Sequence, residues 1–363
     1  MIETYEDWIG SLGLPIHRGF FVEDLRTVET GWWEERGCEV AFIRLTGQED
    51  LLETKVIKIP PGKTTQPWKF ALDDVFYVLE GKGLTAVWGM EQTARKTFEW
   101  GVRSLFLIPR QSYYQLSNAQ GDKPAVLLSH NYFPLATQVV ADPEFYLNNS
   151  YLPEEANVLE EFYSEAKAIK READWGSDTG GITWSGNFFP DLGIWDRLDR
   201  FERRGAGGHQ VRIKYPIATR GGGNSMSVFP AGRYKKAHYH EAGNFIVIPA
   251  GEGFSLIWDD DKERIFIPWH EGSCFAPQFY HQHFNLGTIP ARYLKFGYGW
   301  GGMRRHAQRY FHTRQIEYPD EDPWIRETFE KELSKRGLKS LMPNEVYKKY
   351  DYDWEYAKDS DAD

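Results

Sequence analysis

The stretch Gly232-RYKKA-His238-Tyr-His240-EAG-Asn244-FIVIPA-Gly251 decides the fold. It alternates apolar and aromatic residues between turn glycines, a pattern that predicts short β-strands. Side chains alternate across a strand, so His238 and His240 face the same side of a sheet. A second pair, His281 and His283, lies in another β-rich segment. Two such strands facing one barrel interior would gather three or four imidazoles, the commonest side-chain ligands for iron, copper, zinc and nickel.

The glycines and prolines around this stretch belong to a repeated frame. Five residues recur 170 positions later without a gap: Pro60, Gly62, Gly81, Gly83 and Trp88 match Pro230, Gly232, Gly251, Gly253 and Trp258. Further matches follow with small shifts of offset: Pro109, Asn118, Pro124 and Ala125 match Pro277, Asn285, Pro290 and Ala291. A constant offset over a whole domain predicts an internal duplication of an all-β barrel or sandwich.

Helical patterns flank the second copy. The segment 153–172 places apolar residues at helical spacing among charges and predicts an amphipathic linking helix. Near the end, Asp322 offers an N-cap, Pro323 a first helical position and Gly337 a stop, with Ile325, Phe329 and Leu333 on one stripe. The tail from 348 onward is either a packed extension or disordered.

These patterns divide the chain into four segments. We expect an N-terminal barrel at 1–150, a helical and loop linker at 151–207, a C-terminal barrel at 208–316, and a helix with a tail at 317–363.

Composition excludes several classes of protein. Lys and Arg number 43 against 53 Asp and Glu, and the net charge of -10 would repel a phosphate backbone, so nucleic acid is not expected as a partner. No apolar run approaches the ~20 residues of a spanning helix, and the acidic start is unlike a signal peptide. Two cysteines, Cys38 and Cys274, are too few for a disulfide framework, although the sequence allows a single disulfide between them. The expected location is the cytoplasm, without membrane attachment.

The motifs resemble those of the cupin superfamily. The first matches the pattern Gly, five residues, His-X-His, then a glutamate and a glycine at the family's spacing, with Asn244 in the glutamate position. The second cupin motif is matched by the stretch Gly272-SCFA-Pro277-QFY-His281-QHF-Asn285 of this chain, which has Phe279 where the family usually has a glycine. The resemblance implies a bicupin of two double-stranded β-helix, or jelly-roll, barrels. It also implies His238, His240 and His281 as metal ligands, closer to the three-histidine sites of cupin dioxygenases than to a four-ligand manganese site.

The first copy lacks these ligands. Trp68 and Phe70 stand at the positions of the two histidines, Asp74 at that of the glutamate, and Tyr113 or Tyr114 at that of the third histidine. We expect its interior to be packed with side chains and to bind no metal in this way.

The predicted function is that of a metal-dependent bicupin oxidoreductase, a non-haem Fe(II) dioxygenase cleaving a small anionic or phenolic substrate. Imidazole also binds Mn, Ni, Cu or Zn. An alternative function is therefore a lyase, isomerase or decarboxylase that uses the ion as a Lewis acid, and another is a non-catalytic cupin that binds a small molecule. Expected partners are the small molecule and dioxygen, and a homo-oligomer is compatible with the sequence.

Four further residues are predicted to serve this site. His283 shares the parity of His281 and could be a fourth ligand, a hydrogen-bond partner behind the ligands, or an acid-base residue; the second of these is favoured. Tyr234, Asn244 and Phe279 are predicted to line the substrate space. The other histidines are interpreted as ordinary core or surface residues: His17, His130, His209, His270, His306 and His312.

Overall fold

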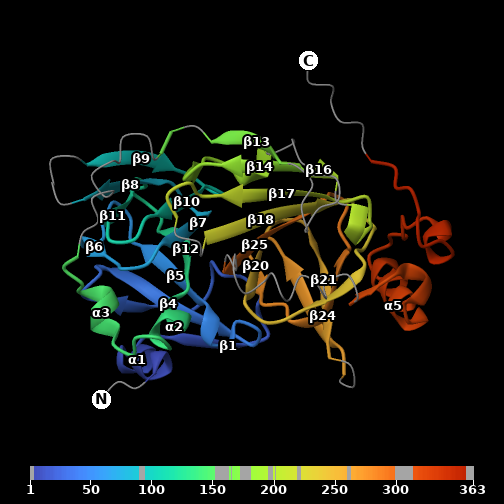
Figure 1. Cartoon of the computed structure of the whole chain (residues 1–363), viewed down its shortest axis with the longest axis horizontal. Coiled ribbons are helices and arrows are strands. Elements are labelled where there is room, and N and C mark those ends of the chain that lie inside the picture. Colours follow the sequence, from blue (N-terminus) through green and yellow to red (C-terminus); the bar gives the residue numbers. More distant parts are fainter. Residues whose placement is uncertain are drawn as a thin grey trace.

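The protein folds into two β-barrels that lie side by side (Figure 1). Each barrel consists of a large and a small sheet. The computed structural model describes residues 4–89, 95–151, 163–164, 166–171, 181–194, 199–200, 202–218, 222–259, 263–298 and 314–356.

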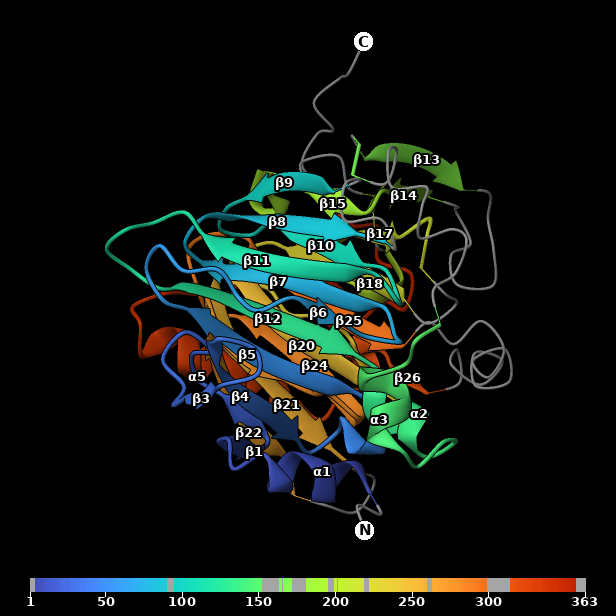
Figure 2. The same ribbon diagram turned by 90° about the vertical axis from the view of Figure 1, so that its left-hand side faces the viewer.

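The first barrel is built mainly from residues before 132. Its large sheet has the order β1 (Ile16–Gly19), β4 (Cys38–Leu45), β5 (Glu53–Ile59), β12 (Ala125–Asn131), β7 (Asp74–Glu80), β10 (Leu105–Ile108) and β15 (Phe188–Phe189), with β3 (Gly31–Trp33) on β4. Its small sheet has the order β6 (Trp68–Lys69), β11 (Tyr113–Asn118), β8 (Gly83–Trp88) and β9 (Lys96–Trp100). Three short helices lie together beside this barrel (Figure 2): α1 (Tyr5–Ser11), α2 (Phe133–Thr137) and α3 (Pro143–Leu147).

The second barrel repeats this plan. Its large sheet has the order β13 (Lys167–Arg171), β14 (Gly181–Ser185), β17 (His209–Lys214), β18 (Gly222–Phe229), β25 (Ala291–Tyr298), β20 (Asn244–Ala250), β23 (Cys274–Phe275) and β2 (Phe21–Val22), with β16 (Asp199–Arg200) on β17. Its small sheet has the order β22 (Ile265–His270), β21 (Glu252–Trp258), β24 (Phe279–Asn285), β19 (Ala237–His240) and β26 (Gln315–Ile316).

The shared strand order confirms the predicted internal duplication of an all-β barrel. The order β4-β5-β12-β7-β10 corresponds to β17-β18-β25-β20-β23, and β6-β11-β8-β9 to β19-β24-β21-β22. The repeated glycines mark close backbone approaches: a Cβ on Gly83 would lie 2.0 Å from the Ser117 carbonyl oxygen, and one on Gly253 would lie 1.9 Å from that of Phe284. Only glycine fits where two strands come this close. The recurrence of these glycines in the sequence therefore indicates that both copies have the same fold.

Each barrel also lends a strand to the other. β1 and β14 run parallel to β4 and β17 in their own barrels, but β2 pairs with β23 of the second barrel and β15 with β10 of the first. Matching hydrogen bonds hold these two exchanged strands, β2 and β15, which we call arms. Ser273 Oγ donates to the Glu23 carbonyl next to β2 over 2.6 Å, and Ser104 Oγ donates to the Pro190 carbonyl next to β15 over 2.5 Å. A single apolar core between the large sheets joins residues of both barrels, among them Val56, Leu128, Met226 and Leu294. The barrels are therefore reciprocally tied.

The predicted linker is corrected by the structure. Lys167–Arg171 is strand β13, antiparallel to β14, and not the end of a helix. Backbone pairing at the sheet edge overrides the helical spacing of its side chains. Most of the predicted helix, 153–162, lies outside the described residues, and the described part of 151–207 includes the strands β13 to β16.

The predicted C-terminal helix is confirmed as α5 (Pro323–Ser334). Asp322 caps it by accepting the Trp324 N–H over 3.0 Å, and Ile325, Phe329 and Leu333 are its buried stripe. The tail is packed at least as far as Trp354, which is buried in the same core as α5.

Two expectations about composition can be compared with the structure. Cys38 and Cys274 are both buried and free, so they do not form a bridge with each other. Among the helices that the structure describes, none has the length and apolar character needed to cross a membrane.

Candidate metal centre

Three imidazoles meet inside the second barrel. His238 and His240 lie on β19 and His281 on β24, and His238 is paired with His281 across the two strands. The ring nitrogens that these residues offer all lie within 4.8 Å of one another. His281 is 1% exposed and His238 9%, whereas His240 is partly exposed. The cluster therefore opens to solvent on the His240 side.

The histidines are held in the form that can bind a metal. Burial lowers the pKa of His281 to about 3 and holds that of His238 well below its usual value, so both rings are neutral at physiological pH. His281 Nδ1 lies 3.0 Å from the Phe279 carbonyl oxygen and His240 Nδ1 lies 2.8 Å from that of Glu241. A carbonyl oxygen only accepts hydrogen bonds, so in both His281 and His240 the proton is on Nδ1. The lone pair of Nε2 is then the one available to a metal ion.

Asn244 reaches this cluster from the opposite sheet. It begins β20, is 1% exposed, and its amide nitrogen lies 3.1 Å from each ring nitrogen of His240. A neutral amide thus stands beside the imidazoles where the cupin motif has a carboxylate. The prediction that Asn244 belongs to the site fits this position.

Phe279 lies at the open side of the cluster. It is paired with His240, is partly exposed, and packs against Tyr239 at a ring-centroid distance of 6.1 Å. Its φ of 58° is in the left-handed region, which costs a residue with a Cβ roughly 1–2 kcal/mol. This is the position where the motif usually has glycine, and its carbonyl is the one that orients His281.

Tyr234 lies elsewhere, and this corrects the expectation that it lines the substrate space. It is buried on the outer side of β24, where it stacks on Phe284 at 4.9 Å and contacts Phe329 of α5. Its hydroxyl bonds to Glu321 and, over 3.1 Å, to Tyr347. Strand β19 begins only at Ala237, so the period of two counted back from His238 does not extend to Tyr234.

His283 forms a layer behind the three imidazoles. Its ring lies 5.4 Å from that of His281, and His283 is not among the residues whose nitrogens converge within 4.8 Å. Its Nδ1 lies 2.8 Å from Ser255 Oγ, which also accepts the Trp269 indole N–H over 3.0 Å. Burial, with smaller contributions from His281 and Lys235, keeps the pKa of His283 well below its usual value. His283 therefore lies next to His281, and the hydrogen bond of its Nδ1 is made with Ser255 and not with one of the three imidazoles.

Positive charge surrounds the cluster. Burial lowers the pKa of His281 most, and the hydrogen bond to the Phe279 carbonyl opposes this. The nearby positive charges of Arg204 and Lys295 lower the pKa of His281 further. Arg204 is 4% exposed and donates to Gln315 Oε1 over 2.6 Å. Cations in a low-dielectric interior favour an anionic ligand. Sequence reasoning missed these residues, although the offset of the duplication could have flagged their change from the first copy.

The first barrel has aromatic rings at the same places. Trp68 is paired with Tyr114 as His238 is with His281, so Tyr114 and not Tyr113 is the counterpart of the third histidine. Their rings stack at 6.4 Å, and the Arg36 guanidinium carbon lies 2.9 Å above the Trp68 ring. Trp68, Phe70 and Tyr114 are all buried. These contacts fit the expected packed interior.

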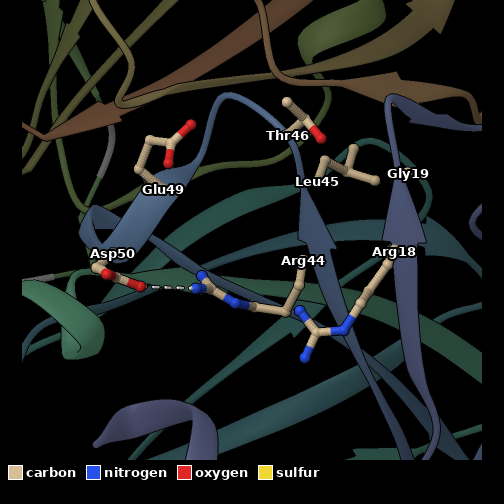
Figure 3. Close-up of a pocket in the computed structure, with 7 residues that line it drawn as sticks. All are labelled: Arg18, Gly19, Arg44, Leu45, Thr46, Glu49 and Asp50. Atoms are coloured by element: carbon tan, nitrogen blue, oxygen red, sulfur yellow. Dashed lines mark hydrogen bonds and ion pairs between the residues drawn. The ribbon is translucent and has the colours of Figure 1, made fainter.

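A surface pocket of about 280 Å³ lies far from these histidines in the sequence, on the edge of the first barrel (Figure 3). Its cations are already paired, because Arg44 contacts Glu6 at 2.7 Å and Asp50 at 3.3 Å, and Arg18 contacts Glu6 at 2.6 Å. The pocket contains none of the predicted site residues.

Comparisons with known proteins give a distant likeness only. No family model and no curated protein matches the chain. A structure of oxalate decarboxylase from Bacillus subtilis at pH 4.6 is 10% identical with a TM-score of 0.47, covering 77% of this chain and 75% of that one. Another, from work on the Mn(II) centres of the same enzyme, is 12% identical with a TM-score of 0.46, covering 77% and 76%. Nothing about the metal or reaction of this chain follows from likeness at that level.

Proposed function

We propose that His238, His240 and His281 hold one divalent metal and that the chain is a metal-dependent oxidoreductase, an Fe(II) dioxygenase acting on a small anionic or phenolic substrate. The observation that carries this proposal is the convergence of ring nitrogens within 4.8 Å. Two of these rings have their Nδ1 engaged by a backbone carbonyl, which leaves Nε2 as the donor atom.

The donor set fits such an ion. Three neutral imidazoles cancel none of its charge, and they occupy only half of an octahedral coordination sphere. Fe(II), when bound, would supply open positions for substrate and dioxygen together with the electrons that dioxygen chemistry requires. Imidazole accepts Mn, Ni, Cu and Zn as well, so metal analysis has to accompany any activity assay.

The chain's own residues would select the substrate. Arg204 and Lys295 place positive charge near His281, which favours an anion or a phenol that ionises on binding. Asn244 lies beside His240, with its amide nitrogen 3.1 Å from each ring nitrogen, and the partly exposed Phe279 lies on the side from which a ligand can enter. His283 is proposed to act from behind the ligands by hydrogen bonding.

The proposal is tested by metal content and oxygen consumption of the whole chain reconstituted anaerobically with Fe(II). We expect about one iron per chain and oxygen uptake that depends on an added phenolic or β-dicarbonyl compound. Turnover without oxygen uptake would instead identify Lewis-acid chemistry, and ligand binding without turnover a binding module. A wild-type chain that takes up no metal contradicts the proposal.

Asn244→Asp is expected to raise the affinity for Mn(II) about tenfold, because a carboxylate then replaces a neutral amide beside the imidazoles and hard ions prefer oxygen anions. Isothermal titration of the metal-free protein measures the change. Asn344→Asp, which adds the same charge at an exposed position beside α5, serves as the control. Equal affinities in the two variants would remove Asn244 from the site.

A further inference from the structure

A second polar layer lies behind the three imidazoles, and the described residues of the first barrel place three aliphatic side chains and a threonine at the same positions. In the second barrel this layer consists of Ser227, Lys235, His283 and Tyr293. The corresponding positions of the first barrel hold Ile57, Thr65, Leu116 and Leu127. The correspondence is structural, since Thr65 N donates to the Leu116 carbonyl over 2.9 Å and Lys235 N to that of His283 over 3.0 Å.

Polar groups here are costly unless they are used. Lys235 is 1% exposed and Ser227 2%. Leaving a buried polar group unsatisfied costs about 1–3 kcal/mol, and the first copy shows that the same barrel can be built with aliphatic side chains and a threonine. The polar layer is therefore not a requirement of the fold.

The directions of the hydrogen bonds leave the hydroxyl proton of Tyr293 for a ligand. Lys235 Nζ donates to Ser227 Oγ and, over 3.1 Å, to Tyr293 Oη. Ser227 passes its own proton to the His209 carbonyl over 3.2 Å. Tyr293 receives a hydrogen bond from Lys235, and within the described part of the chain no residue accepts the proton of its hydroxyl.

Tyr293 stands one ring beyond the ligands. Its ring centroid is 5.0 Å from that of His283, which in turn is 5.4 Å from that of His281. It shares the inward face of β25 with Lys295, two residues along the strand, and it is half-buried. At this separation its hydroxyl would meet the far end of a ligand and not the atoms that bind the metal.

Building on the proposed function, we propose that Tyr293, oriented by Lys235, donates a hydrogen bond to a second oxygen group on the metal-bound ligand. The ligand is then a small molecule with a chelating head and an acceptor, such as a carboxylate, at its other end. The positive charge of Lys295 on this side favours that acceptor as an anion. Lys235 is a positioning residue, because it acts through Tyr293.

Two probes that differ only at the far end test this inference. Catechol offers the chelating oxygens alone, and 3,4-dihydroxybenzoate adds a carboxylate. Both are titrated anaerobically against iron-loaded wild type, Tyr293→Phe, Lys235→Met and the control Tyr280→Phe, whose ring stacks on Trp258 on the other side of β24 at 5.8 Å. Thermal melting of each variant verifies its folding.

We expect Tyr293→Phe to weaken 3,4-dihydroxybenzoate about tenfold, the equivalent of one hydrogen bond to a charged group, and to leave catechol within twofold. Lys235→Met should reduce the same preference, and Tyr280→Phe should leave both probes unchanged. A structural role for Tyr293 would weaken both probes alike, and that result, or no change for either, overturns this inference while the metal centre stands. A wild-type chain that binds no iron overturns the proposed function and this inference together.

Discussion

The double substitution His238→Ala and His281→Ala is expected to lower bound metal from about one ion per chain to background. The two rings are paired across β19 and β24, with ring centroids 4.1 Å apart, and without them only His240 of the three ligands remains. A single imidazole does not retain a divalent ion through purification, because affinity depends on several donors acting on one ion. Mass spectrometry of metal content, on protein purified without a histidine tag, measures the loss.

A matched control removes the same number of imidazoles elsewhere. His17 contacts the Glu29 carbonyl and His270 that of Glu271, both outside the cluster. The variant His17→Ala, His270→Ala should keep its metal. Metal retained by the cluster variant, or lost equally from both, would show that the ion is bound somewhere else.

The substitution Lys55→Met is expected to destabilise the first barrel by about 3–5 kcal/mol, the usual cost of leaving buried carboxylates without their cation. Lys55 is 3% exposed and forms an ion pair with Glu53, which is fully buried. Asn131 also donates to Glu53 over 2.9 Å, and Ser129 donates to the nearby Asp74 over 2.7 Å. Lys55 thus neutralises Glu53 directly, and its charge also lowers the pKa of Asp74.

The pH dependence gives this prediction a second readout. Burial raises the pKa of Asp74 from 3.8 to about 6, and Lys55 opposes that rise. Between these values the folded protein binds more protons than the unfolded one, so the contribution of Asp74 to stability is present below about pH 4 and is lost as the pH rises to about 6. Without Lys55 the charged carboxylate is still less favourable, so the variant should lose more stability at pH 7.5 than at pH 4.5.

Urea denaturation of wild type and variant at the two pH values measures both effects. Lys58→Met is the control, because Lys58 lies on the same strand and donates to the Val28 carbonyl over 2.7 Å instead of binding a carboxylate. A Lys55→Met variant no less stable than the control, or equally destabilised at both pH values, would contradict the role assigned to this lysine.

The sequence was most informative where one residue type is physically required. Gly83 and Gly253 stand where backbones leave no room for a Cβ, so their recurrence predicts the duplication. The paired histidines lie within regular strands, where the period of two is reliable, and it places His238 and His240 together. The same period is misleading for Tyr234, which precedes the strand.

Other features could not have been predicted from local spacing. The cluster of Glu53, Lys55, Asp74 and Asn131 draws on three strands that are adjacent only in the folded sheet. The arms β2 and β15 have two residues each, too short for any periodicity, and their partners are more than 80 residues away along the chain. Lys235 and Tyr293 likewise show their relation only when the two barrels are superposed.

The exchanged arms have a consequence for how this gene can change over evolutionary time. A duplicated domain that no longer performs its original chemistry is ordinarily free to be deleted. Here the first barrel supplies β2 to the edge strand β23 of the second, and the two large sheets share one apolar core. Deleting the copy that lacks the clustered histidines would expose the edge strand β23 and one side of this shared core, so the second barrel could not be expected to keep its stability without the first.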